Sequence, residues 1–337
     1  MKTKVHTSSL VKWLLIAAFV IALPLVMPNT YVIRILDMVG IYILLSTGSN
    51  ILTGYAGQLS MGQAGFYGLG AYTAGLMSMY LGANLWLTLP CAILIACVFG
   101  LILAIPALRL KGGYLTLLTI GFGEIFRLVM NNWVDFTRGP SGITGITEAS
   151  FFGFALSSHI RWYYFIFAIA ALGLVYQSIV MKSRVGRAFV AIREDDQAAE
   201  LTGIDITRYK VMAFITSAIY CAIAGVLYAH MTGYISPDSF TSNESNFILW
   251  SAIVGGLGTQ LGPILGGIIM VVFPEALRAL GALRLVIFGV ILMLVIIYYP
   301  KGLVPFLEDI YRKIRARFFP QRQDTAKAGS NKQDGGA

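Results

Sequence analysis

The densest polar chemistry in this chain lies between Lys182 and Lys210, where 29 residues carry eleven of its 41 charged side chains. The six basic and five acidic members are Lys182, Arg184, Arg187, Arg193, Arg208 and Lys210, and Glu194, Asp195, Asp196, Glu200 and Asp205. Side chains of this kind make ion pairs and hydrogen bonds at a surface. The segment is either a rigid shape that a partner protein grips or a solvated loop lying on lipid, and both interpretations remain open.

The order of residues in this segment predicts two short helices. Apolar residues recur at helical spacing and form one stripe on the first helix: Val185, Phe189 and Ile192. Asp195 and Asp196 suit the start of a second helix, where free N–H groups favour an acceptor and negative charge. Gly203 is a natural left-handed stop after it, and Asp205 or Thr207 caps the helix that follows.

The rest of the chain is strongly apolar and indicates an integral membrane protein. Hydrophobic residues make up 57% of the 337 positions and charged residues only 12%, about half of the roughly 25% usual in soluble domains. The net charge of +9 comes from basic residues that cluster beside spans and near both ends of the chain. Retention of basic residues on the cytoplasmic side explains this pattern better than nucleic-acid binding does.

Apolar windows predict an all-α, polytopic fold of nine or ten transmembrane segments. The expected spans are 12–28, 32–52, 60–82, 85–107, 113–131, 161–181, 210–231, 246–257, 262–280 and 284–300. The expected division is a first span with a cytoplasmic N-terminus at 1–31, a membrane core at 32–181, a cytoplasmic loop at 182–209, a second membrane core at 210–305, and a basic cytoplasmic tail at 306–337, disordered at its end.

The last apolar block contains a predicted break. Glycine and proline interrupt it at Gly255, Gly256, Gly258, Gly262 and Pro263. The piece before the break, 246–257, is only about a dozen residues and too short to cross a bilayer at ~1.5 Å per residue. Neighbouring helices must therefore cover its exposed backbone.

The segment 50–75 contains many glycines and several polar residues. Glycines such as Gly54, Gly57 and Gly68 predict close helix packing in lipid. The polar residues Asn50, Gln58, Ser60 and Gln63 are costly in lipid and must face protein or water. They either line a path for a zwitterionic solute or make hydrogen bonds between helices.

Glu124 and Arg127 are three residues apart in an expected span, which places them on one helix face. An ionisable pair inside a membrane marks either a functional site, here the same translocation path, or a self-neutralising structural pair, and both interpretations remain open. No second ionisable chain supports proton transfer.

The sequence predicts no enzyme, metal site or cofactor. The three histidines are isolated, and the three cysteines lie inside apolar runs. No phosphate-binding G-x-x-x-x-G-K-[ST] motif occurs, so the chain cannot hydrolyse ATP by that route.

Five motifs, in order, resemble permeases of branched-chain amino-acid ABC transporters of the LivM type. They are GYAGQLSMGQAGFYGLGAYTAG (54–75), LRLKGGYLTLLTIGFGEIFR (108–127), TRGPSGITGI (137–146), GRAFVAIREDDQAAELTGIDITRYKVMAF (186–214) and VGGLGTQLGPILGG (254–267). The resemblance covers roughly residues 40–300 and implies the ABC importer permease fold in a bacterial inner membrane, with both termini cytoplasmic.

The resemblance also implies partners. They are a second related permease, two ABC ATPase subunits and an extracytoplasmic solute-binding protein, besides membrane lipid. It implies that a coupling loop fits a groove on the ATPase, with these residues: Arg187, Phe189, Ile192, Arg193, Glu194, Asp195, Asp196 and Gly203.

Other functions remain open. An ion-coupled secondary transporter would need no ATPase, with Glu124 carrying protons and the broken helix forming its site. Within the ABC class, urea or short-amide importers and aromatic-acid importers use the same permease architecture.

Overall fold

The computed structural model describes Pro24 and residues 29–110, 112–147, 150–151, 154–155, 158–281 and 283–318. The predicted first span at 12–28 and the end of the tail after 318 lie outside these residues, Pro24 apart. The helices are α2 (Thr30–Ser49), α3 (Gln63–Leu81), α4 (Leu85–Ala107), α5 (Gly113–Asn132), α6 (Val134–Thr137), α7 (His159–Lys182), α8 (Arg184–Glu194), α9 (Asp196–Leu201), α10 (Ile206–Thr232), α11 (Ser242–Gly255), α12 (Gly262–Ala276), α13 (Leu283–Tyr298) and α14 (Leu303–Phe318). A π-helical turn, η1 (Asn50–Tyr55), extends α2, and single 3₁₀ turns form η2 (Gly139–Ser141), η3 (Pro237–Phe240) and η4 (Arg278–Leu280).

The predicted all-α class is confirmed. Strands are limited to two antiparallel pairs of two residues each among the described residues: β1 (Ile143–Thr144) with β4 (Tyr234–Ile235), and β2 (Ser150–Phe151) with β3 (Phe154–Ala155). Five helices in the described part of the chain are long and apolar enough to cross a membrane: α2 with η1, α4, α5, α7 and α10. A sixth span results if α13 and the start of α14, bent by 59°, are taken together. The total of nine or ten segments stays a prediction.

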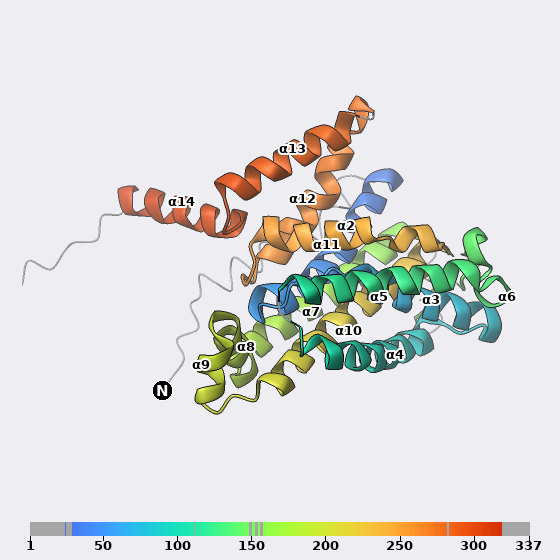
Figure 1. Cartoon of the computed structure of the whole chain (residues 1–337). Helices are drawn as coiled ribbons and strands as arrows, with labels where there is room; N and C mark the ends of the chain where they lie inside the picture. Colours follow the sequence, from blue (N-terminus) through green and yellow to red (C-terminus); the bar gives the residue numbers. More distant parts are fainter. Residues whose placement is uncertain are drawn as a thin grey trace, which may run out of the picture.

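Helix α14 crosses the expected boundary between membrane core and tail at 305/306. The short α11 has 14 residues, too few to span a bilayer alone, and lies against its neighbours as Figure 1 shows. Its ends therefore depend on other elements for their hydrogen bonds.

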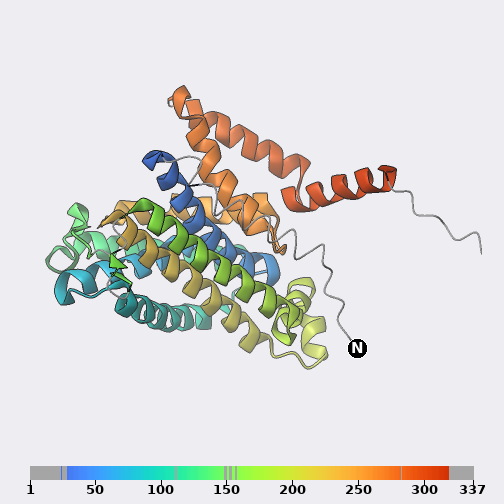
Figure 2. The same cartoon turned by 180° about the vertical axis from the view of Figure 1, so that it is seen from behind.

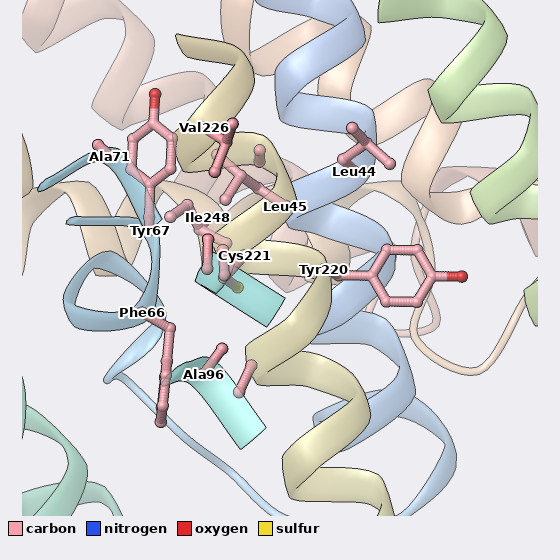
Figure 3. Close-up of a cluster of buried hydrophobic side chains, with 14 of the residues drawn as sticks. Leu44, Leu45, Phe66, Tyr67, Ala71, Ala96, Tyr220, Cys221, Val226 and Ile248 are labelled. Atoms are coloured by element: carbon pink, nitrogen blue, oxygen red, sulfur yellow. The ribbon is translucent and has the colours of Figure 1, made fainter. Parts of the chain in front are cut away.

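Helices α2 and α10 form the centre of the bundle. The most apolar 18 residues of α2 with η1 are 78% buried and those of α10 are 61% buried, against 17% for α5 and α7. Figure 3 shows Leu44 and Leu45 of α2 beside Tyr220, Cys221 and Val226 of α10. Residues from α3 and α11 complete this core, while α5 and α7 present most of their surface outward.

Close contact between α3 and α10 depends on glycine. A Cβ at Gly70 would overlap the backbone of Ala222, and a Cβ at Gly225 would overlap the carbonyl of Tyr67. Gly68 packs in the same way against Phe126 and Phe240, at 2.5 and 2.9 Å from an added Cβ. Small residues allow this approach where lipid gives helices no hydrophobic reason to associate.

The bundle has two ends, which Figures 1 and 2 show from opposite sides. At one, the α8 end, lie α8, α9, η1 and the connection 256–261. At the other, the η3 end, β1 pairs with β4, and the Tyr80 hydroxyl donates to the carbonyl of Phe136 at 3.1 Å. The connection between α4 and α5 and the charged segment between α7 and α10 both lie at the α8 end, where they line one cavity.

Candidate functional site

The segment between α7 and α10 is folded into two capped helices. The Ser183 hydroxyl accepts from the amide of Val185 at the start of α8. The Asp195 carboxylate accepts from the amides of Gln197 and Ala198 at 2.8 and 3.1 Å, and therefore caps α9. The predicted two helices and their acidic start are confirmed, because these caps satisfy amides that a helix cannot pair itself.

The next turn also follows the sequence pattern. Gly203 has φ +82°, a left-handed backbone that suits glycine, and the Asp205 carboxylate accepts from the amide of Arg208 at 3.0 Å to cap α10. Of the two caps predicted for this helix, Asp205 is the one formed.

One face of α8 packs on the bundle and the other faces outward. Phe189 and Ile192 are buried and Val185 is half-buried, with the Phe189 ring 6.3 Å from that of Tyr209. The predicted apolar stripe is confirmed. On the outward side, Leu201 at the end of α9 is 89% exposed. Leu201 therefore leaves one apolar side chain on the outer side of the charged segment.

One ion pair joins the segment to the bundle, and a second lies between neighbouring residues of α8. The Lys210 ammonium lies 2.6 Å from Asp196, joining α9 to α10, and both side chains are mostly buried. The Arg193 guanidinium lies 2.6 Å from Glu194 through Nη2. A partly buried pair of this length restricts the two helices more than a solvated surface pair would.

Arg193 also reaches into the bundle. Its Nη1 donates to the carbonyl of Gly54 in η1 at 2.8 Å. Gly57, with φ +70°, passes directly over the same side chain, so that an added Cβ would lie 2.8 Å from Arg193 Cγ. The predicted coupling residue and two predicted packing glycines thus meet at one point.

The chain between α11 and α12 is interrupted where the sequence predicts. α11 ends at Gly255, Gly256 and Gly258 have φ of +122° and +72°, and α12 begins at Gly262 with Pro263 in its first turn. The Thr259 hydroxyl donates to the Gly256 carbonyl at 2.7 Å and accepts from the Gly262 amide at 3.0 Å. Threonine therefore closes the break into a compact turn.

The four polar residues predicted for the path have different surroundings. Asn50 is fully buried and joins η1 to the break, because its Nδ2 donates to the Thr259 carbonyl and its Oδ1 accepts from the Gly258 amide, both at 2.8 Å. Ser60 accepts from the amide of Gly62 at 3.4 Å, and Gln58 is buried beside the cavity described below. Gln63 is buried with no hydrogen-bond partner for its side chain among the described residues. Asn50 makes hydrogen bonds between helical elements, the alternative to lining a solute path. That these residues line a path stays a prediction.

Glu124 and Arg127 share one face of α5, as predicted, with Arg127 Nε 3.0 Å from Glu124. The structure adds two contacts. The Ser242 hydroxyl at the start of α11 donates to Glu124 at 2.5 Å, and Asp238 of η3 lies 4.0 Å from Arg127. The pair therefore fastens α5 to α11 at the η3 end, and its role in transport stays a prediction.

Sequence reasoning missed two acidic residues. The Tyr42 hydroxyl of α2 donates to Glu244 in the first turn of α11 at 2.6 Å. Asp37 of α2 is fully buried, and neither carboxyl oxygen has a hydrogen-bond partner among the described residues. For Asp37 the available signal was an acidic residue within the expected span 32–52, which is costly inside a membrane, whereas Glu244 lies just before the expected span 246–257.

A cavity of about 450 Å³ opens at the α8 end beside the α8–α9 turn. It is lined by Ala56, Gly57, Gln58, Leu59, Ala107, Leu110, Gly112, Leu115, Ile192, Arg193, Glu194, Asp195, Asp196, Gln197 and Lys210. Two connections of the bundle, η1–α3 and α4–α5, therefore meet the charged segment around one open space.

Comparisons with known proteins show which family the chain resembles. A family model described as "Branched-chain amino acid transport system / permease component" matches residues 31–296. The chain is 36% identical to the high-affinity branched-chain amino acid transport system permease protein LivM of Salmonella typhimurium, over 81% of this chain and 70% of that protein. It is 37% identical to the LivM protein of Escherichia coli K12, over 79% and 68%.

A more distant relative is LivH of Salmonella typhimurium, 27% identical over 78% of this chain and 91% of that protein. No solved structure matches. With the family model covering the chain from the start of α2 to the last turn of α13, this multi-pass membrane protein belongs to the family of branched-chain amino acid transport system permease components.

Proposed function

We propose that this chain is the permease subunit of an ATP-driven importer for branched-chain amino acids, and that α8 and α9 are its contact with a separate ATPase. Its relatives are named as permeases of branched-chain amino acid transport, which supports the substrate class. The chain moves solute by alternating access, while ATP is bound and hydrolysed on the partner. Both LivM and LivH are relatives, which supports a second permease of related fold.

The observation that carries the proposal is the exposure of Leu201 on a segment that is rigidly joined to the bundle. Caps at Ser183, Asp195 and Asp205 hold the two helices, and the Asp196–Lys210 pair fixes α9 to α10. An exposed leucine on such a base offers a partner an apolar anchor, and the charges around it offer orientation.

The α8 end then faces the cytoplasm, which agrees with the basic residues Arg109, Lys182, Arg184 and Arg187 there. In this orientation both termini are cytoplasmic, in a bacterial inner membrane. An extracytoplasmic solute-binding protein docks on the η3 end, over the connections 133–158 and 233–241.

The anchor is tested by replacing Leu201 in the complex with its ATPase. Leu201→Gln keeps a long helix-forming side chain and removes the apolar surface, whereas Leu201→Met keeps it. Burial of a leucine contributes about 1.5–3 kcal/mol, so the glutamine variant should bind the ATPase about ten- to a hundredfold more weakly and the methionine variant nearly normally. Equal affinity of the two variants would place the ATPase contact elsewhere.

The wider assignment is tested by reconstituting the chain with its second permease, ATPase and binding protein in liposomes. Leucine, isoleucine or valine with the binding protein should stimulate ATP turnover and uptake, and urea, amides or aromatic acids should not. Ion-gradient-driven uptake by this chain alone, indifferent to ATP, would instead establish the secondary transporter.

A further inference from the structure

Arg193 is the last arginine of α8, and its guanidinium leaves the charged surface to enter the bundle. Nη1 donates to Gly54 O at 2.8 Å while Nη2 remains with Glu194. Gly54 lies in the final turn of the long helix formed by α2 and η1, whose last carbonyl groups have no later amide of the same helix to accept from. A cation is favourable at this end of a helix, both as a donor and as a charge.

The guanidinium fits between glycines of two separate segments. An added Cβ at Gly57 would lie 2.8 Å from Arg193 Cγ and 3.2 Å from its Cα. An added Cβ at Gly258, on the connection between α11 and α12, would lie 2.8 Å from Arg193 Nη1 and 3.1 Å from the Gly54 carbonyl oxygen. Arg193 therefore touches η1 and the helix break at once, with no room for a side chain between them.

The two surfaces that Arg193 touches are also bonded to one another. Asn50 of η1 holds the break through the Gly258 amide and the Thr259 carbonyl. One residue further along the break, Gln260 donates to the Ser178 hydroxyl of α7 at 3.3 Å. The turn of η1, the break and the end of α8 are thus one continuous hydrogen-bonded body at the α8 end of the bundle.

We propose that Arg193 is the positioning residue that joins α8 and α9 to η1 and to residues 256–261, so that these three parts move as one body during transport. This inference rests on the proposed contact of α8 and α9 with an ATPase. When the ATPase displaces the α8–α9 segment, the C-terminal ends of α2 and α11, at the α8 end of the bundle, move with it.

Distances between spin labels test the single-body movement without changing Arg193. Labels are placed on cysteines at Gln197, Leu261 and Leu81, which are all exposed, after alanine replaces Cys91 and Cys97. In the complete transporter, the Gln197–Leu261 distance should be equal without nucleotide and with ATP and vanadate. The Gln197–Leu81 distance, measured across the bundle to the η3 end, should change. A nucleotide-dependent Gln197–Leu261 distance overturns the inference.

Substitution then tests the link itself. Arg193→Gln should lower solute uptake about tenfold while ATP turnover persists, and should make the Gln197–Leu261 distance depend on nucleotide. Arg193→Lys, which keeps a cationic donor, should restore part of the uptake. Arg109→Gln is the matched control, because this exposed guanidinium lies outside the α8–α9 segment and makes no hydrogen bond or ion pair with the described residues.

The two proposals fail differently. Tightly coupled uptake by Arg193→Gln, in a transporter whose ATPase affinity still depends on Leu201, would overturn the role of Arg193 alone. An ATPase affinity that is indifferent to Leu201 would overturn the docking surface and this inference together.

Discussion

The side chain of Asn50 accepts a hydrogen bond from the amide of Gly258, 208 residues later, at 2.8 Å. Its other amide atom donates to Thr259, so that both ends of a fully buried side chain are used. The Asn50 side chain thereby joins η1, near the start of the chain, to the break between α11 and α12.

Replacing Asn50 by leucine should destabilise the protein. The change leaves the partly buried Gly258 amide and Thr259 carbonyl without this partner, at up to about 1–3 kcal/mol each. Thermal unfolding in detergent should show a clearly lower midpoint. Asn132→Ala is the control, since its amide donates to Leu128 on an exposed stretch of α5 and should change the midpoint little. Equal shifts for both variants would contradict the structural role of Asn50.

Charge reversal at Asp196 should uncouple ATP hydrolysis from uptake. Asp196→Lys places an ammonium beside Lys210, which now lies 2.6 Å from the carboxylate, and α9 loses its attachment to α10. Uptake per ATP hydrolysed should fall several-fold in reconstituted transporter. The double variant Asp196→Lys with Lys210→Asp should recover part of the coupling. Normal coupling in the single variant, with intact assembly, would show that the pair is dispensable.

Glu124→Gln should reduce uptake. Glutamine cannot form the ion pair with Arg127, which is left with only the 4.0 Å approach of Asp238, and it weakens the bond from Ser242 at the start of α11. Initial uptake rates should fall at normal expression, whereas Asp238→Asn, at an 82% exposed side chain, should have little effect. Unchanged uptake would assign the pair a purely local role.

Gly70→Ala should loosen the contact between α3 and α10. The new Cβ overlaps the backbone of Ala222, which cannot move aside as a flexible side chain can. The cost should be about 1–3 kcal/mol, typical of overpacking, and should appear as a lower unfolding midpoint. Gly289→Ala in α13 is the matched control, because an added Cβ there meets nothing within 4 Å and alanine favours helix. A midpoint unaffected by Gly70→Ala would contradict this packing.

The sequence alone determined the membrane class, the long apolar helices and the internal design of the charged segment. These features depend on neighbours a few residues apart. The apolar composition indicates that the chain lies in a membrane. The helical spacing of Phe189 and Ile192 defines the buried face of α8. Asp195 caps the start of α9, and the left-handed Gly203 follows its end.

Only the tertiary structure decided which of these elements meet. Asn50, Gly54, Arg193 and Gly258 had been expected to line a path, pack helices, contact an ATPase and break a helix, yet they form one junction. Ser242 donates a hydrogen bond to Glu124, and Tyr42 donates one to Glu244, each across more than a hundred residues. Spacing along the chain carries no information on such contacts, because they arise when whole helices pack and buried polar groups must find partners in the space that remains.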